Sequence, residues 1–247
     1  MLEWITRYAS PQIAYNLANR LVPWFGWCAV LLLGAGLYGA LFYAPPDYQQ
    51  GQGFRIIYVH VPAAWMSLFV YMVMASAGAG TLIWKTKVSE SVARACAPLG
   101  AAFTFLALVT GSLWGKPMWG TWWVWDARLT SELILLFLYL GYMALQSAIE
   151  ERRAAARAGA VLALVGVVNI PIIHYSVVWW NTLHQGSTVT KLGAPSIALS
   201  MLIPLLIMSL AYMCYFAAVL LIRVRADIME QEGNSTWVRE RVLEGRP

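Results

Sequence analysis

Residues 197–222 read IALSMLIPLLIMSLAYMCYFAAVLLI and contain no charged side chain. A helix needs about 20 predominantly apolar residues to cross the hydrocarbon core of a bilayer, so this stretch predicts a membrane-spanning helix. Five more stretches are similarly long and apolar. Together they contain one charged residue, Glu132, at the start of one of them. The six predicted spans are residues 23–44, 56–84, 95–113, 130–149, 158–180 and 197–222.

The composition of the whole chain indicates the same environment. Of its 247 residues, 60% are hydrophobic and 12% are charged, and the mean hydropathy is +0.61. Soluble domains carry about 25% charged residues. We therefore predict an all-α fold, a single polytopic membrane domain over residues 1–247. It comprises an interfacial segment at 1–22, a bundle of six transmembrane helices at 23–222 and a cytoplasmic tail at 223–247.

The positions of lysine and arginine predict the orientation, because basic residues that flank spans are retained on the cytoplasmic side. With the N-terminus on that side, both termini are cytoplasmic, and the split of the 17 basic residues is thirteen to four. This retention explains the net charge of +5. Nucleic acid is excluded as a partner, because the basic and the aromatic-rich loops lie on opposite sides. The thirteen are Arg7, Arg20, Lys85, Lys87, Arg94, Arg152, Arg153, Arg157, Arg223, Arg225, Arg239, Arg241 and Arg246, and the four are Arg55, Lys116, Arg128 and Lys191.

The most distinctive motif is WGKPMWGTWWVWDARLT, residues 114–130, predicted as an outer loop between the third and fourth spans. Indole is flat and polarizable and carries one donor N–H. A group of indoles therefore serves either as a platform for a large conjugated ring or as an interfacial aromatic belt. A belt is spread over several helix ends, whereas five of the thirteen tryptophans crowd this connection. They are Trp114, Trp119, Trp122, Trp123 and Trp125.

Two of the three histidines are predicted on the same outer side. His60 lies in VHVP at the outer end of the second span, and His184 lies in WWNTLHQGS just beyond the fifth. Imidazoles on iron, aromatic planes and cations near carboxylates are the components of a heme site. For each histidine alone, the ordinary interpretation is a hydrogen-bonded polar residue at an interface. His174, inside the fifth span, is interpreted as buried and bonded to a neighbouring helix, with cofactor contact as the alternative.

Together these motifs resemble the WWD family of heme-handling membrane proteins, named for its tryptophan-rich signature. The six spans, the chain length and WDARLTSELIL, residues 125–135, resemble the cytochrome c maturation branch of that family. Other branches have more spans and usually read Trp-Asp-Pro where this chain has Trp125-Asp126-Ala127. The resemblance covers nearly the whole chain.

The resemblance implies that heme b is bound non-covalently at the outer, periplasmic face of a bacterial inner membrane and passed to a membrane-anchored periplasmic heme chaperone. It also implies the ATP-binding and permease subunits of an ABC transporter and a small single-span subunit as partners. His60 and His184 are the expected axial ligands of the heme iron. The other expected heme-binding and acceptor-docking residues are Trp114, Trp119, Trp122, Trp123, Trp125, Asp126 and Arg128.

Basic residues on the outer side are candidates for pairing with the heme propionates. Arg128 is the first candidate, because a guanidinium binds carboxylates bidentately. Arg55, Lys116 and Lys191 are further candidates. Asp126 either belongs to the site directly or orients an arginine or an indole N–H, and the sequence leaves both open.

Several other functions are excluded or less favoured. No Walker motif occurs, so any ATP is hydrolysed by another chain. The three cysteines lie in separate spans without CxxC or CxxCH, which excludes a thiol oxidoreductase and a c-type cytochrome. We expect a heme-delivery component and not an enzyme. A b-type cytochrome that transfers electrons and a permease subunit with an aromatic belt are the alternatives, and whether heme crosses the bilayer through this protein stays open.

Overall fold

The computed structural model describes residues 9–180, 182–184, 186 and 194–243. Every regular element in this part of the chain is a helix. Six helical stretches are long and apolar enough to cross a membrane, which confirms the predicted all-α fold with six spans. The side of the membrane on which each end lies stays a prediction. The six stretches are Pro11–Tyr43, Gln52–Trp84, Lys87–Trp119, Ala127–Ala148, Arg152–Trp179 and Leu199–Gln231.

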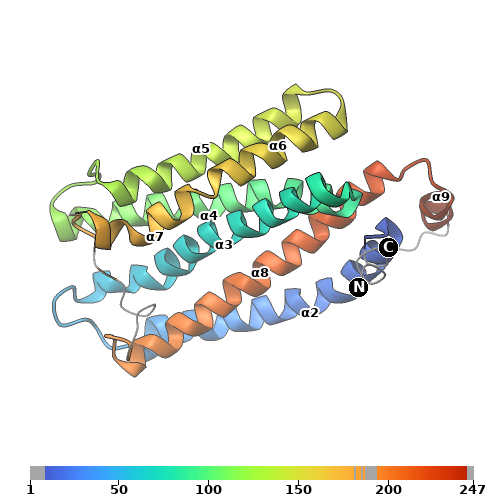
Figure 1. Ribbon diagram of the computed structural model, residues 1–247. Coiled ribbons are helices and arrows are strands. Elements are labelled where there is room, and N and C mark those ends of the chain that lie inside the picture. Colours follow the sequence, from blue (N-terminus) through green and yellow to red (C-terminus); the bar gives the residue numbers. More distant parts are fainter. Residues whose placement is uncertain (1–8, 181, 185, 187–193, 244–247) are drawn as a thin grey trace.

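The helical elements of the described residues follow one another along the chain (Figure 1). In chain order they are α2 (Pro11–Tyr38), the π-helical turn η1 (Gly39–Tyr43), the 3-10 helix η2 (Gln52–Ile56), α3 (Ile57–Trp84), α4 (Lys87–Trp119), α5 (Ala127–Ala148), α6 (Arg152–Gly166), α7 (Asn169–Trp179), α8 (Leu199–Gln231) and α9 (Thr236–Leu243).

The helices extend beyond the predicted spans. α2 begins at Pro11, so residues 11–22 continue directly into the first span. α4 runs from Lys87 to Trp119, whereas its apolar stretch covers only 95–113. Apolar composition marks the part of a helix that crosses hydrocarbon, while the backbone hydrogen bonds continue into the polar interface. The interfacial placement of residues 1–22 stays a prediction.

Residues 114–130 do not form one loop as predicted. The first part of this segment is the end of α4, and the last part is the first turn of α5. Gly120 ends α4 in the left-handed conformation (φ 76°), and its N–H donates to Lys116 O at 3.1 Å, a C-terminal cap that favours glycine. Asp126 caps α5, because its Oδ1 accepts from Leu129 N–H at 2.8 Å. Helices therefore fix the direction of Trp114, Lys116, Trp119 and Arg128, whereas Trp122, Trp123 and Trp125 lie in the connection between α4 and α5.

The fifth span consists of two helices, α6 and α7. Pro171 explains the break, because its nitrogen has no hydrogen to donate to Val167 O and its ring clashes with that carbonyl. Val167 O accepts instead from Ile170 N–H at 3.0 Å. Asn169 lies at the break and donates from Nδ2 to Ser131 O at 2.9 Å. This hydrogen bond attaches the start of α7 to α5.

Small residues allow the helices to approach closely. α2 and α8 lie side by side along one side of the bundle (Figure 1). Gly36 of α2 and Ala40 of η1 are buried there, and a Cβ at Gly36 would lie 2.6 Å from Met208 Sδ of α8. In the main apolar core, a Cβ at Gly100 of α4 would lie 2.0 Å from Cζ of Tyr139 of α5. Small residues thus mark close helix contacts, as in other membrane bundles.

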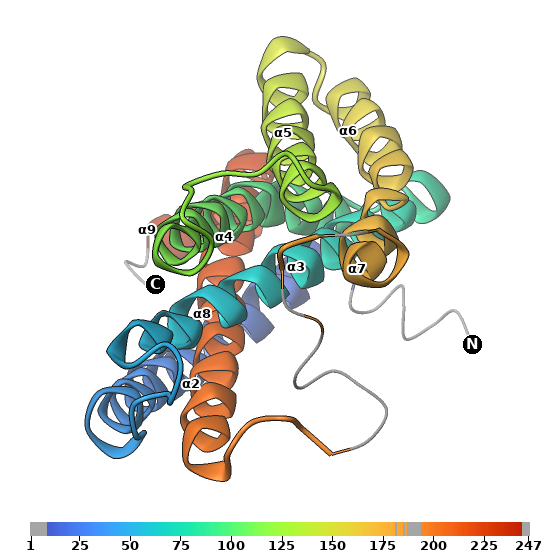
Figure 2. The ribbon, with the colours of Figure 1, turned by 90° about the vertical axis from the view of Figure 1, so that its left-hand side faces the viewer.

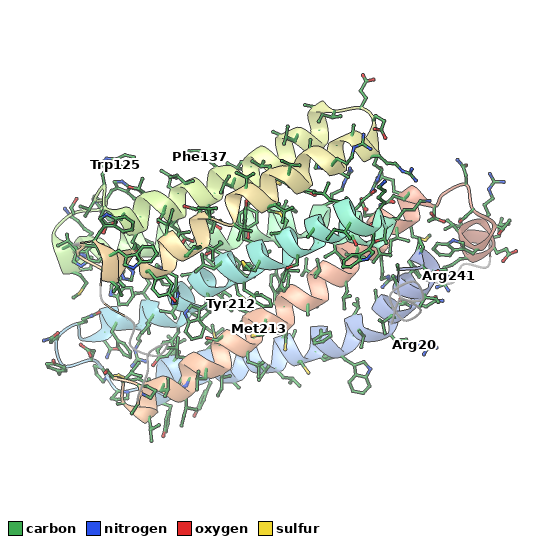
Figure 3. All side chains as sticks on the ribbon, in the orientation of Figure 1. Arg20, Trp125, Phe137, Tyr212, Met213 and Arg241 are labelled. Atoms are coloured by element: carbon green, nitrogen blue, oxygen red, sulfur yellow. The ribbon has the colours of Figure 1, made fainter. Side chains whose placement is uncertain are left out.

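The two ends of the bundle differ chemically. Trp125 lies at one end and Arg241 at the other (Figure 3). We call the first the tryptophan end; the connection that follows α4 and the C-terminal end of α7 lie there (Figure 2). At the other end, Asp227 of α8 accepts from Arg152 NH2 of α6 at 2.6 Å. Between the ends, apolar side chains such as Phe137 project outward (Figure 3), which suits contact with lipid.

Candidate functional site

A cavity lies at the tryptophan end, between α3, α4, α5 and the segment that follows α7. It contains about 770 Å³ of space between protein atoms, with the open solvent at its mouth included. Most of its lining is apolar or aromatic. The described residues that line it are Gln50, His60, Ala64, Ala107, Leu108, Gly111, Ser112, Trp114, Gly115, Met118, Trp119, Arg128, Leu129, Glu132 and His184.

His60, near the start of α3, is oriented by a residue of α4. Its Nδ1 lies 3.0 Å from Thr110 Oγ1. The Thr110 hydroxyl donates its single hydrogen to Leu106 O, its nearest acceptor at 2.6 Å, so its oxygen accepts from His60 Nδ1–H. This hydrogen bond leaves Nε2 of His60 without a proton and able to ligate a metal. Gly111 provides room for the ring, since a Cβ there would lie 3.0 Å from His60 Cε1.

His184 meets His60 across the cavity. The centres of the two imidazole rings are 6.3 Å apart, and the ring planes differ by 34°. The indole of Trp119 packs against His184 with ring centres 6.1 Å apart. Trp114 packs edge-on against His60 at 5.7 Å. The fold therefore brings together two predicted histidines and two predicted tryptophans that come from three separate parts of the chain.

The connection between the first two spans also reaches the cavity. Gln50 lines it and accepts, through Oε1, a hydrogen bond of 2.8 Å from Trp114 Nε1–H. The turn is held by Asp47, whose Oδ1 accepts from Gln50 N–H at 2.8 Å, and by Gly51, whose φ of +56° favours glycine. Gln50 thus fixes the rotation of the indole that packs against His60.

Two charged groups lie in the wall of the cavity, Arg128 and Glu132. They are one turn apart on α5 and therefore lie on the same face of the helix. Arg128 NH1 donates to Ile173 O of α7 at 3.3 Å. Glu132 is 8% exposed, and its Oε1 accepts from Ser67 Oγ of α3 at 2.7 Å. Each charged group is therefore held by a hydrogen bond to a neighbouring helix.

Three of the predicted tryptophans lie outside the cavity lining. Trp122 and Trp125 are 53% and 73% exposed, and Trp123 packs edge-on against Trp125 with ring centres 5.4 Å apart. The ammonium group of Lys116 lies 5.8 Å from the centre of the Trp122 ring. Oδ2 of Asp126 and Nε1 of Trp123 are buried and have no hydrogen-bond partner among the described residues. These residues form an aromatic surface beside the cavity.

Arg55 does not reach the cavity. Its guanidinium donates to Ala40 O and, at 3.0 Å, to Ala44 O, so it caps the end of the first span. Lys116 is exposed and is likewise absent from the described lining. Lys191 lies outside the described residues. Among the basic candidates that the structure describes, Arg128 is the one that lines the cavity.

The prediction that His174 is buried is wrong. α7 buries Asn169, Ile173 and Ser176, which share one face of the helix. His174 follows Ile173 by one residue, about 100° further around the helix, and its side chain is exposed. Its ring packs against Tyr175 with ring centres 4.7 Å apart, and it does not line the cavity.

Comparison with known proteins identifies the family of this chain. The family model described as heme exporter protein C, CcmC, matches residues 4–239. The chain belongs to the heme exporter protein C family. A protein of that name from Haemophilus influenzae is 49% identical over 239 residues, 97% of each chain. Another from Escherichia coli is 49% identical over 243 residues, 98% of each chain. A Marchantia polymorpha protein named a cytochrome c biosynthesis ccmC-like mitochondrial protein is 49% identical over 180 residues, 73% of this chain and 75% of its own.

Membership of the heme exporter protein C family confirms the resemblance seen in the sequence and, with the six spans, makes the chain a multi-pass membrane protein. Three contacts in the cavity were not predicted. Glu132 carried a signal, because a charge inside a span is by default a functional candidate. Thr110 and Gln50 carried none, since their roles depend on partners 50 and 64 residues away.

Proposed function

We propose that the cavity binds heme b non-covalently, with His60 and His184 as axial ligands, and that the chain passes the heme to an acceptor during cytochrome c maturation. The observation that carries the proposal is the meeting of the two imidazoles across one cavity. The names of the heme exporter protein C relatives and of the cytochrome c biosynthesis relative support the same cargo and pathway.

The spacing of the histidines suits a single iron between them. Metal–imidazole nitrogen bonds are about 2 Å long and the nitrogen lies about 1 Å from its ring centre, so rings on opposite sides of one metal ion have centres about 6 Å apart. The observed 6.3 Å agrees with this value. Nε2 of His60 is free because Nδ1 carries the proton and donates a hydrogen bond to Thr110 Oγ1. Among the described residues, no group of three metal-binding side chains competes as a metal site.

The remaining wall suits a flat, mostly apolar ring with acidic edges. Trp114 and Trp119 provide aromatic surface beside the two imidazoles. Arg128 provides a guanidinium that binds carboxylates such as the heme propionates. Large conjugated ligands gain most of their affinity from such apolar burial, with a few polar groups to fix their orientation.

The exposed tryptophans suit the docking of a protein that accepts the heme. Trp122 and Trp125 leave much of their indole surface uncovered next to the cavity. Exposed aromatic residues are enriched where proteins bind one another. We propose that this surface docks a membrane-anchored periplasmic heme chaperone, and that the subunits of an ABC transporter and a small single-span protein complete the assembly. The excess of basic residues at the opposite end supports a periplasmic position of the site in a bacterial inner membrane.

The first test is the visible absorption spectrum of the full chain, purified in detergent together with its chaperone. The parent is expected to show a heme Soret band, and His60→Ala and His184→Ala are each expected to weaken or shift it. His174→Ala is the matched control, because His174 does not line the cavity. A parent without heme despite an adequate supply, or a band unchanged in both ligand variants, would refute the proposal.

A second test separates binding from delivery. Trp119→Ala removes an indole that packs against His184 and is expected to reduce the heme content of the purified chain. Trp125→Ala changes an exposed side chain and is expected to retain heme but load the chaperone more slowly. Equal chaperone loading by the Trp125→Ala variant and the parent, at equal protein level, would contradict a docking role.

A further inference from the structure

Glu132 is a buried acid that the proposed function leaves unused. It lines the same cavity as the two histidines and is 8% exposed. Ser67 Oγ lies 2.7 Å from its Oε1 and holds the carboxyl group in place from α3. A carboxylate is expensive to bury, so one that faces a cavity inside a membrane span is a functional candidate.

The described cavity wall contains one basic and one acidic side chain besides histidine. Among the described lining residues other than histidine, Arg128 is the cationic one and Glu132 the anionic one. They lie one turn apart on α5, so each lies within the electrostatic field of the other. An arriving heme brings two propionate carboxylates, which attract Arg128 and repel Glu132. The wall therefore attracts these carboxylates less strongly than Arg128 would alone.

We propose that Glu132 keeps heme binding reversible by opposing the interaction of Arg128 with the propionates. This inference rests on the proposed function, because it takes heme as the cargo. Delivery to an acceptor requires release, and a site with an uncompensated guanidinium holds an acidic cargo too long. Glu132 weakens the field of Arg128 and repels the propionates, so it acts through its charge and not as a ligand.

The test is the rate at which the heme-loaded full chain, purified in detergent, gives up heme to an excess of apomyoglobin. Glu132→Gln keeps the shape of the side chain and an oxygen that accepts from Ser67, and it removes only the charge. Release is expected to slow by roughly tenfold, the order expected for one unit charge about 12 Å away at an effective dielectric constant near 20. The Soret band is expected to keep its position, because the ligands are unchanged.

Glu132→Asp is the matched control, because it shortens the side chain but keeps the carboxyl group. Release from this variant is expected to stay within about twofold of the parent rate, since the charge moves by little more than one bond length. Release from Glu132→Gln that is unchanged or faster, or slowing by Glu132→Asp of the same size, overturns the inference. A parent that carries no heme overturns the proposed function and this inference with it, whereas a loaded parent with unaltered release in Glu132→Gln overturns the inference alone.

Discussion

Replacing Thr110 by valine tests how His60 is prepared as a ligand. Valine has nearly the shape of threonine but cannot accept the hydrogen bond from His60 Nδ1–H, which the parent forms at 3.0 Å. The ring is then free to rotate or to carry its proton on Nε2, the atom proposed to ligate iron. The substitution therefore removes the control of the tautomer while leaving the ligand itself in place.

The magnitude follows from the burial of the contact. Thr110 is 8% exposed, so the N–H of His60 loses a partner in a place where water does not replace it easily. A buried donor left without an acceptor costs about 1–3 kcal/mol. Loss of a group that orients a metal-bound histidine typically lowers metal affinity by about 10- to 100-fold. The second value predicts that heme binds about 10- to 100-fold more weakly to Thr110→Val. The first applies to the heme-free and the heme-bound chain alike, so it lowers stability and not affinity.

The assay is a titration of the heme-free chain with heme, followed at the Soret band. Thr110→Ser is the control, because its hydroxyl also donates to Leu106 O and accepts from His60. It is expected to bind heme with an affinity close to that of the parent. Parent-like affinity in Thr110→Val, or an equal loss in both variants, would show that the hydrogen bond does not position His60.

Two further predictions concern stability. Gly100→Ala places a Cβ 2.0 Å from Cζ of the buried Tyr139, and overpacking of this kind costs about 1–3 kcal/mol, so the apparent Tm in detergent is expected to fall by several degrees. Gly26→Ala, whose Cβ meets no atom within 4 Å, is the control and is expected not to lower it; equal Tm values in the two variants would contradict the packing argument. The hydrogen bond from Lys87 lowers the pKa of the Glu232 carboxyl below its ordinary 4.5 in the folded chain. The stabilisation that this ion pair gives the fold is therefore present above pH 4.5 and is lost as the pH falls through the lowered pKa. Glu232→Gln is expected to lower the Tm near neutral pH and to have less effect in acid; a difference from the parent that does not change with pH would count against this ion pair.

Much of the fold was predictable because the bilayer imposes simple rules. A helix that crosses hydrocarbon must satisfy its own backbone and be apolar over about 20 residues, so composition alone revealed the six spans. The helix ends were not predictable in the same way. Residues 114–119 are polar and aromatic enough to suggest a loop, yet they continue α4 up to the left-handed Gly120.

The candidate site was predictable where a motif carries recognisable chemistry. His60, His184, Trp114, Trp119 and Arg128 were singled out from the sequence, and all five line one cavity. Their roles as heme ligands and partners stay predictions. Arg55 belonged to the same predicted set, but the structure commits its guanidinium to backbone carbonyl groups at the end of the first span. Hydropathy and motif patterns do not reveal which hydrogen-bond acceptor a long, flexible arginine side chain contacts.

The sequence by itself determined the environment, the number of spans and the family, because these depend on composition and on short motifs. The tertiary structure decided which residues share a cavity. It set His60 and His184 6.3 Å apart, supplied Thr110 as a support for His60 and Gln50 as one for Trp114, and left the His174 side chain exposed outside the cavity. The physical reason is that contacts between distant segments depend on helix rotation and close packing, and a shift of one residue turns a side chain by about 100°.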